Sequence, residues 1–352
     1  MMDGAERGRV ISATAINARG GIVAISAEPV SARPIRWGLV GLGKFASDAV
    51  MPAIARSGRA VVVACATRDP AKARAFAERF GVPRVHDTID SLVRDDGIDA
   101  VFVATPNVHH VPVVLAAAAA KKHVFCEKPL AVDVASGQAA VRACRDAGVV
   151  LRLGLHLRCE PSLARIAEIL RAGTIGAVRA LSVERSAPLD ERVPWRTDPA
   201  AGGSILYDVG IHLLDLVPRL VDSEIASVSA LASPPPSGGL AAETITMLLR
   251  LKNGVQATAR ASREAPYTAS DLVVIGTEGM LRTGPLRWVD EHNIAVITAA
   301  GLSEEAIPAA DLYRAELEAF ADDVADGGTR LATGEDGLRL IAIADSVQRA
   351  LR

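Results

Sequence analysis

Aromatic residues are scarce in this chain of 352 residues, where phenylalanine, tryptophan and tyrosine together make up 3%. The hydrophobic half of the sequence is therefore mostly alanine, valine and leucine. Such a composition favours helices and buried parallel strands. It argues against an aromatic-rich β-sandwich and against a lectin surface that holds sugars by ring stacking.

An excess of charge of one sign is also lacking. Lysine and arginine number 39 and aspartate and glutamate number 41, so the formal net charge is −2. A near-neutral chain argues against a nucleic-acid partner and against binding to an acidic membrane surface. The longest apolar run, Val111–Ala120, is too short to span a bilayer. We therefore expect no membrane partner.

Cysteine is nearly absent, with four residues in the whole chain (Cys65, Cys126, Cys144 and Cys159). None of them forms a CxxC pair, which argues against a zinc knuckle or a thioredoxin-like site. His109 and His110 are adjacent, so they cannot share a helical face as metal ligands, and we predict no metal site. The pattern is typical of reduced, buried thiols in a cytoplasmic protein. Residues 1–34 lack the apolar core of a signal peptide, and we expect them to be a poorly ordered extension or an over-called translation start.

What the chain does contain is a regular alternation of strands and helices over its first half. The expected strands are Ile35–Val40, Ala60–Ala66, Asp99–Ala104, His123–Cys126 and Val149–Leu155. The expected helices follow Asp69-Pro70, cover Val108–Lys121 and cover Asp133–Ala147. Because these strands carry little polar alternation, they predict an α/β fold, a doubly wound parallel sheet with helices on both faces.

The pattern changes near residue 157. A helix is expected at Ser162–Ala172, and strands at Ala177–Glu184, Ile225–Ala232, Thr244–Leu251, Val255–Ser262 and Asp271–Gly276. Asn253-Gly254 is a strong hairpin signal, and residues 234–239 read as a loop rich in proline and glycine. We therefore expect an α+β domain over 157–310 with a largely antiparallel sheet and one open face. The helices of residues 311–352 are expected to pack back toward the parallel-sheet domain of residues 35–156.

A glycine motif follows the first strand directly. Gly41, Gly43 and Ala46 fit the pattern G-x-G-x-x-A, with Lys44 and Phe45 between them. The first glycine permits a tight turn, the second admits a pyrophosphate to the backbone, and the small third residue allows close packing of helix on strand. The motif predicts a dinucleotide site.

Two residues at the end of the second strand bear on the choice of dinucleotide. Thr67 and Arg68 offer a hydroxyl and a guanidinium where an acidic residue would hold the ribose of NAD. These groups suit a 2′-phosphate, so NADP is favoured over NAD. The alternative is that Arg68 stacks on adenine or faces solvent.

Three further segments carry a family resemblance. Thr105-Pro106-Asn107 with His110 follows one strand, and Glu127-Lys128-Pro129 follows the next. In the second half, the pattern G-G-x-x-x-x-D-x-G-x-H runs from Gly202 to His212. Together they resemble the Gfo/Idh/MocA family, named after glucose–fructose oxidoreductase, inositol dehydrogenase and a rhizopine-catabolism protein. The resemblance covers about residues 35–352 and implies an NAD(P)-dependent oxidoreductase that acts on a secondary alcohol or ketone of a sugar, inositol or related polyol.

The resemblance also implies roles for individual residues. His212 would exchange the proton, Lys128 would polarise the reacting oxygen, and Asp208 would bind or orient the substrate. Simple chemistry agrees, since an ammonium steadies negative charge on oxygen and a neutral histidine is a suitable base near pH 7. Asp208 and His212 are four residues apart, hence on one helical face. The alternative is a buried core histidine and an aspartate that only starts a helix.

The remaining site residues follow the same resemblance. Cofactor contacts are implied for Thr105, Pro106, Asn107, His110, Glu127 and Lys128, and substrate contacts for His156, Arg158, Trp195 and Arg196. For these last four, a purely structural place is an equal alternative. The family further implies a homodimer or homotetramer formed through the open sheet, and a small polyhydroxylated substrate. Two other functions remain open: a lyase or glycosidase that regenerates its cofactor, and a non-catalytic dinucleotide-binding sensor.

Overall fold

The computed structural model describes residues 14–16, 22–24, 33–188, 190, 193–234, 242–264, 268–284 and 291–351. Within residues 1–34, Thr14–Ile16 (β1) and Ile22–Ala24 (β2) pair as a short antiparallel ladder. Nearly all the rest of that segment, where we expected an extension without order, lies outside the described residues. The same holds for most of the loop expected at residues 234–239.

A parallel sheet forms from the first half of the chain, as the strand pattern predicts. Its order is β17-β8-β7-β6-β3-β4-β5, and all pairs are parallel except β17 with β8. The parallel strands are β3 (Ile35–Val40), β4 (Ala60–Ala66), β5 (Arg84–His86), β6 (Ala100–Val103), β7 (His123–Glu127) and β8 (Leu151–Gly154). Strand order reverses at β3, which has β4 on one side and β6 on the other. Ligands of open α/β sheets bind beside the carboxyl ends of the strands at such a point.

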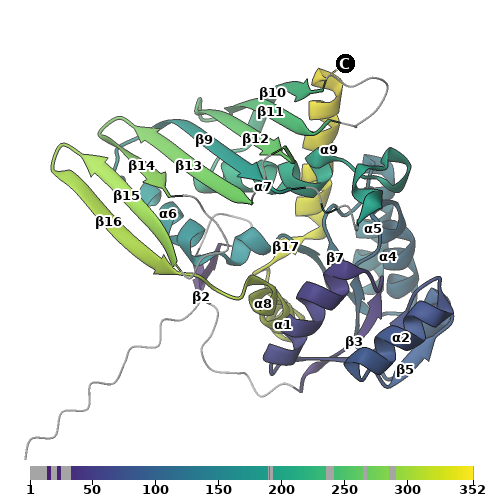
Figure 1. The fold of residues 1–352 in the computed structure, drawn as a ribbon. Helices are drawn as coiled ribbons and strands as arrows, with labels where there is room; N and C mark the ends of the chain where they lie inside the picture. Colours follow the sequence, from purple (N-terminus) through teal and green to yellow (C-terminus); the bar gives the residue numbers. More distant parts are fainter. Residues whose placement is uncertain are drawn as a thin grey trace, which may run out of the picture.

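Helices cover both faces of this sheet (Figure 1). One face carries α1 (Met51–Arg56), α2 (Pro70–Phe80) and α8 (Leu312–Asp326), and the other carries α3 (Ile89–Val93), α4 (His110–Ala119), α5 (Val134–Ala147) and α9 (Gly334–Ala350). The expected cap of α2 is present, since the Asp69 side chain accepts hydrogen bonds from two backbone amides of the first turn. The chain leaves α2 at Gly81 in the left-handed conformation, where glycine carries no steric penalty.

The few aromatic residues gather on the face that α8 covers. Trp37 and Phe320 lie 4.8 Å apart between ring centroids, and Phe102 stacks on Phe125 at the same separation. All four side chains are buried. Such pairs add stability beyond the area they bury, so this cluster fastens the C-terminal helix α8 to the first sheet.

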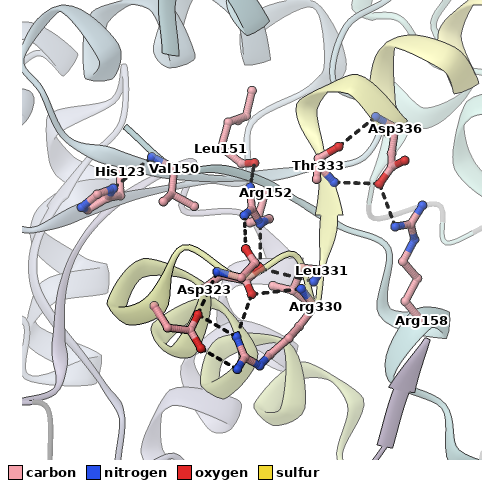
Figure 2. A network of polar contacts seen from close by, with 12 residues as sticks. His123, Val150, Leu151, Arg152, Arg158, Asp323, Arg330, Leu331, Thr333 and Asp336 are labelled. Atoms are coloured by element: carbon pink, nitrogen blue, oxygen red, sulfur yellow. Dashed lines mark hydrogen bonds and ion pairs between the residues drawn. The ribbon is translucent and has the colours of Figure 1, made fainter. Parts of the chain in front are cut away.

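A polar network holds the same C-terminal return (Figure 2). Arg152 of β8 donates to Asp323 of α8 at 2.6 Å, and Asp323 also accepts from the backbone and side chain of Arg330. Beside it, Asp336 at the start of α9 pairs with Arg158 at 2.9 Å. Between them β17 (Ala332–Thr333) extends the parallel sheet by one antiparallel strand. These ion pairs therefore fasten the C-terminal segment, α8 to α9, to the first half of the chain.

The second half forms a mixed, mainly antiparallel sheet of order β10-β11-β12-β9-β13-β14-β15-β16. Its strands are β9 (Val178–Ser186), β10 (Ile225–Ser233), β11 (Thr244–Leu251), β12 (Gln256–Ser262), β13 (Ala269–Gly276), β14 (Gly279–Thr283), β15 (Glu291–Thr298) and β16 (Gly301–Pro308). The hairpin predicted at Asn253-Gly254 joins β11 to β12 and is confirmed. Helices α6 (Pro161–Arg171) and α7 (Ile211–Leu220) cover one face. Within the described ranges no helix covers the other face (Figure 1), where Leu248 and Ile275 are exposed.

The sequence pattern did not predict β14, β15 and β16. Every side chain of β16 except one is exposed, so this strand has no buried face to impose an apolar alternation. The apolar stretch Pro199–Leu220 is long enough to cross a membrane by length and composition, but it is mostly buried against the sheet. Its hydrophobicity is therefore that of a core helix.

Candidate active site

The residues singled out from the sequence meet between the two sheets, in a cavity of about 170 Å³. One wall is formed by loops at the carboxyl ends of β6 and β7, and the opposite wall by the π-helical turn η6 (Leu206–Gly210) that continues as α7. The predicted residues that line it are Phe45, Thr105, Asn107, His110, Glu127, Lys128, His156, Trp195, Arg196, Asp208 and His212.

Lys128 projects from the end of β7 across the cavity. Its ammonium donates a hydrogen bond to the backbone carbonyl of Asp208 at 2.7 Å and another to the Asp208 carboxylate at 3.3 Å. Burial lowers the pKa of Lys128 from its usual value, and the neighbouring charge of Asp208 opposes that effect. The result is a largely buried ammonium held in place by one residue of the second domain.

Asp208 is the only carboxylate that three cations share among the described residues. Its oxygens lie 3.3 Å from Lys128, 3.7 Å from Arg196 and 3.4 Å from Arg263. Burial alone would raise the pKa of Asp208, but these three positive charges outweigh it and lower the pKa to about 2. Asp208 is therefore ionised near neutral pH, and its carboxylate holds Lys128 in place.

His212 stands on the same helical stretch as Asp208 and faces the same cavity. It is 4% exposed, and its ring lies 4.7 Å from that of His156 between centroids. Burial, then the charges of His156, Lys128 and Arg185, hold the pKa of His212 well below its ordinary value. The imidazole is therefore neutral near pH 7, the form that can accept a proton.

The helix that carries these two residues begins differently from the sequence expectation. Residues Leu206–Gly210 form a π-helical turn before α7 begins. Such turns are rare and are frequent at functional sites. A spacing of four residues is still close to one full π-helical turn, so Asp208 and His212 share a face as expected.

The glycine motif fits a dinucleotide. A β-carbon added to Gly41, whose φ is +96°, would lie 2.4 Å from the carbonyl oxygen of Ala104, so only glycine permits this turn. A β-carbon on Gly43 would meet no atom within 4 Å, which leaves open space at its backbone. Gly43, Lys44 and Phe45 line a neighbouring cavity of about 480 Å³. The tight turn and the free backbone beyond it are what a pyrophosphate at a helix start requires.

The two cavities share five wall residues: Phe45, Ala104, Trp195, Arg196 and Tyr313. The cavity beside the glycine motif therefore adjoins the one that holds Lys128, Asp208 and His212. Pro106 does not line either cavity, and Ala46 is buried in the core where the helix packs on the sheet. Thr67 and the exposed Arg68 follow β4 at the same edge of the sheet. The structure places no carboxylate against Arg68 among the described residues.

Asn107 and His110 connect loops around the site. Asn107 donates a hydrogen bond to the carbonyl of Gly202 at 2.8 Å, which links the first domain to the second. The two ring nitrogens of His110 lie 2.6 Å and 2.9 Å from the carbonyl oxygens of Pro129 and Thr105. His110 lies between these two loops and lines the cavity, and its contact with the cofactor stays a prediction. Burial raises the pKa of Glu127 to about 7, against the opposing charge of Lys128.

Arg158 departs from the expectation that it would face the substrate. Its guanidinium is buried in ion pairs with Asp215 of α7 and Asp336 of α9, and it does not line the cavity. His156 also follows the sixth parallel strand, β8, and its side chain does line the cavity. Both residues lie in the 3-10 helical segment η3 (His156–Cys159), where residues two apart point to different sides, so Arg158 is directed into the core.

The glycine pair of the second-half motif has a packing reason. A β-carbon on Gly203 would lie 2.2 Å from the carbonyl oxygen of Trp195. The loop that carries Trp195 and Arg196, which includes the turn η4 (Pro194–Thr197), therefore lies directly on the glycine backbone. Both side chains reach the cavity because this contact is so close.

Sequence reasoning missed three charged or polar residues of the site: Arg185 and Tyr313, which line the cavity, and Arg263, which pairs with Asp208. Arg185 continues the inward-facing series of Leu181 and Val183 on β9, and Arg263 continues that of the alternate alanines on β12. An arginine at an inward-facing position of an alternating strand could have been recognised from the sequence as a candidate site residue. Tyr313 contacts the rings of Phe45 and His156, whereas the sequence indicated only that a helix begins in this region.

Comparison with known proteins agrees with this geometry. Residues 35–155 match the model of the Gfo/Idh/MocA oxidoreductase family with an NAD-binding Rossmann fold, and residues 163–282 match the C-terminal domain of that family. The chain is 31% identical over 319 residues to a 1,5-anhydro-D-fructose reductase of Ensifer adhaerens, covering 90% of this chain and 96% of that protein. It is 31% identical to an NADP⁺-dependent D-xylose 1-dehydrogenase of Haloferax volcanii, over 88% of this chain and 95% of that one.

A solved structure is also similar. The aldose–aldose oxidoreductase of Caulobacter crescentus, crystallised with glycerol, superposes with a TM-score of 0.81 at 26% identity, over 91% of this chain and 98% of that one. The fold, both halves of the motif set and these relatives lead to one conclusion: the chain belongs to the Gfo/Idh/MocA family of NAD(P)-dependent oxidoreductases.

Proposed function

We propose that this protein transfers a hydride between NADP, or NAD, and a secondary alcohol or ketone of a sugar or related polyol. The observation that carries the proposal is the common cavity of Lys128, Asp208 and His212, which shares wall residues with the cavity of the glycine motif. The relatives from Ensifer adhaerens and Haloferax volcanii are named for reactions of this type on sugars.

The residues divide the acid–base part of the reaction. Bound in the cleft, the nicotinamide cofactor supplies or receives the hydride. In the direction of oxidation, neutral His212 takes the hydroxyl proton while the ammonium of Lys128 donates a hydrogen bond to the same oxygen and steadies its growing negative charge. Asp208 keeps Lys128 charged and oriented through its two contacts. In the reverse direction, the proton returns to the new hydroxyl from His212.

NADP is the cofactor we favour. Arg68 is exposed at the end of β4 with its guanidinium available, and Asp69, the one carboxylate close by in the sequence, is occupied as the cap of α2. The relative from Haloferax volcanii uses NADP⁺ by its name. A guanidinium is suited to a 2′-phosphate because it forms paired, charge-assisted hydrogen bonds.

The test is a spectrophotometric screen of NADP⁺ and NAD⁺ with matched sugars, inositols and sugar acids, followed by nicotinamide absorbance. We expect turnover with at least one member of the panel and a lower KM for NADP⁺. Conversion of a substrate without net change of nicotinamide absorbance would replace the proposal by a cofactor-recycling lyase or glycosidase. Cofactor binding without any conversion would replace it by a sensor.

We also propose that the protein is a cytoplasmic homodimer or homotetramer joined through the open face of the second sheet. Leu231, Leu248 and Ile275 lie exposed on that face, and partnerless apolar patches of this kind mark interfaces. All four cysteines are buried free thiols, in keeping with a reducing compartment. A monomer in sedimentation at working concentration would contradict the assembly.

A further inference from the structure

Arg185 occupies an unusual position at the back of the catalytic cavity. It lies on the inward face of β9 and lines both the catalytic cavity and a smaller inner cavity of about 70 Å³. Ser270 stands directly opposite on β13, and its hydroxyl accepts a hydrogen bond from Arg185 at 3.2 Å. The guanidinium is thereby held where the two cavities meet.

Within the part of the chain that the structure describes, no carboxylate forms an ion pair with this guanidinium, and Ser270 is its hydrogen-bond partner. The charges of Asp208 and Glu160 act on it without direct contact. Arg185 is half-buried, and two buried arginines are both neutralised: Arg152 by Asp323, and Arg158 by Asp215 and Asp336. Burying a charge without a partner is unfavourable, so proteins rarely do it without a function. Burial lowers the pKa of Arg185 itself, in the direction that an uncompensated charge requires.

The charges around the cavity show the same imbalance. Four cations line or adjoin it, namely Lys128, Arg185, Arg196 and Arg263, and three of them share the single carboxylate of Asp208. Glu127 is the other acidic group in the wall, and burial raises its pKa. The protein alone therefore leaves the cavity with an excess of positive charge, and Arg185 is its least compensated member.

We propose that Arg185 binds a carboxylate of the substrate, so that this oxidoreductase acts on a sugar acid or other polyhydroxy acid rather than on a neutral sugar. The inference rests on the proposed function and narrows its substrate class. A guanidinium matches the planar carboxylate with two parallel hydrogen bonds. A phosphate carries more charge and more acceptor oxygens than Arg185 and Ser270 can satisfy. The rest of the inner cavity is lined by leucine and alanine, by a few polar side chains and by the carboxylate of Glu160, which would repel the second charge of a phosphate.

The same contact links substrate choice to acid–base chemistry. The positive charge of Arg185 helps to depress the pKa of both His156 and His212. A carboxylate on Arg185 cancels part of that charge and so raises the pKa of His212 toward its ordinary value. His212 thus becomes a stronger proton acceptor when an acid occupies the site.

The test uses pairs of compounds that differ only in a carboxylate: D-gluconate with D-sorbitol, and D-glucuronate with D-glucose, with D-glucose 6-phosphate as the phosphate arm. Binding to the full-length protein is measured by calorimetry, and turnover with NADP⁺ by absorbance. The variants are Arg185→Gln, the charge-preserving Arg185→Lys, and Arg179→Gln as a control, since Arg179 is an exposed arginine of the same strand.

We expect the unsubstituted protein to bind an acid at least about tenfold more tightly than its neutral partner. Removing a buried partner of a charge pair typically weakens binding strongly, so Arg185→Gln should lose about 10²-fold for the acid and little for the neutral compound. Arg185→Lys should keep part of the preference, and Arg179→Gln all of it. Thermal unfolding of each variant checks that the fold persists.

Equal or absent binding of the acids by the unsubstituted protein would overturn the inference, as would equal losses for acid and neutral compounds in Arg185→Gln. Tighter binding of the phosphate would replace the carboxylate by a phosphorylated substrate. Turnover of neutral sugars alone would leave the proposed oxidoreductase in place while removing the inference. If acids bind in a way that needs Arg185 but nothing is turned over, the carboxylate site stands and the proposed oxidoreductase activity is contradicted.

Discussion

At the scale of single residues, environment decides what each group in the site can do. Lys128 and Asp208 are ordinary in isolation, yet burial pushes the pKa of the lysine down, and the surrounding cations pull the pKa of the aspartate to about 2. The motifs predicted both residues because each follows a strand or begins a helix at a fixed spacing. The prediction that Arg158 faces the substrate differs from the structure, because sequence spacing does not indicate which way a short 3-10 turn directs a side chain.

Replacing Lys128 by alanine tests the reaction at its centre. The substitution removes the hydrogen-bond donor to the reacting oxygen, and we expect kcat to fall by about 10²-fold or more. Steady-state kinetics and circular dichroism on the same preparation measure the loss and the fold. Turnover close to that of the unsubstituted protein would contradict the role assigned to Lys128.

Replacing Arg68 by alanine tests cofactor choice. Loss of a charge-assisted hydrogen bond at an exposed position should raise the KM for NADP⁺ by about tenfold and leave that for NAD⁺ nearly unchanged. The two constants are measured side by side with a single substrate. An equal rise for both cofactors would show that Arg68 does not contact the 2′-phosphate.

The pH dependence of alcohol oxidation tests the state of His212. Protonation would stop His212 from accepting a proton, and its pKa is depressed well below the ordinary value, chiefly by burial. The rate should therefore stay level as pH falls through the ordinary histidine range near 6.5, about the value for a free side chain, and drop only at lower pH. Arg185→Gln should move that drop to higher pH, because it removes a positive charge. A decline centred near the free-histidine value would contradict a depressed pKa.

At the scale of elements, the strongest sequence signals came from strands buried on both faces and from helices with caps. The parallel strands other than the short β5, and the helices α2, α4 and α5, were predicted close to their observed bounds. The strands β14, β15 and β16 were not, because an outer, solvated strand such as β16 needs no apolar pattern. The π-helical turn η6 is likewise invisible in sequence, since it differs from an α-helix only in its hydrogen-bond spacing.

The close contact of Gly203 with the loop of Trp195 gives an element-scale prediction. Gly203→Ala would place a β-carbon 2.2 Å from the Trp195 carbonyl oxygen, so the loop must move away. Because Trp195 and Arg196 line the cavity, KM for the substrate should rise several-fold or more while the stability changes less. Gly58→Ala is the matched control, since its β-carbon would meet no atom within 4 Å. Identical KM values in the two variants would separate this loop from substrate binding.

At the scale of the whole molecule, the C-terminal part of the chain, from α8 onward, packs back against the first sheet. Helix α8 contributes Phe320 to the aromatic cluster and Asp323 to the network of Figure 2. The sequence shows how few aromatic residues there are, but it does not show that several of them cluster where α8 packs on the first sheet. Pairs so distant along the chain, such as Arg152 with Asp323, leave no local pattern.

Removing the carboxylate of Asp323 should therefore destabilise the molecule as a whole. Asp323 is fully buried, and Asp323→Asn leaves Arg152 and Arg330 without their shared partner. Loss of one member of a buried pair costs about 3–5 kcal/mol, to be measured by urea unfolding. Asp345→Asn, which breaks the exposed pair with Arg349, should cost at most about 1 kcal/mol. Similar midpoints for the two variants would contradict a structural role for the network.

The return of α8 and α9 also bears on how new enzymes could be assembled from this one. The second sheet enters after β8 and ends before α8, so it sits within the chain of the first domain as an insertion. A chimera that grafts another substrate domain onto this dinucleotide domain therefore needs two junctions, one on each side of the insertion. A chimera with a single junction would combine this dinucleotide domain with the α8 and α9 of the other protein. Trp37, Arg152 and Arg158 would then lose their matched partners on these helices.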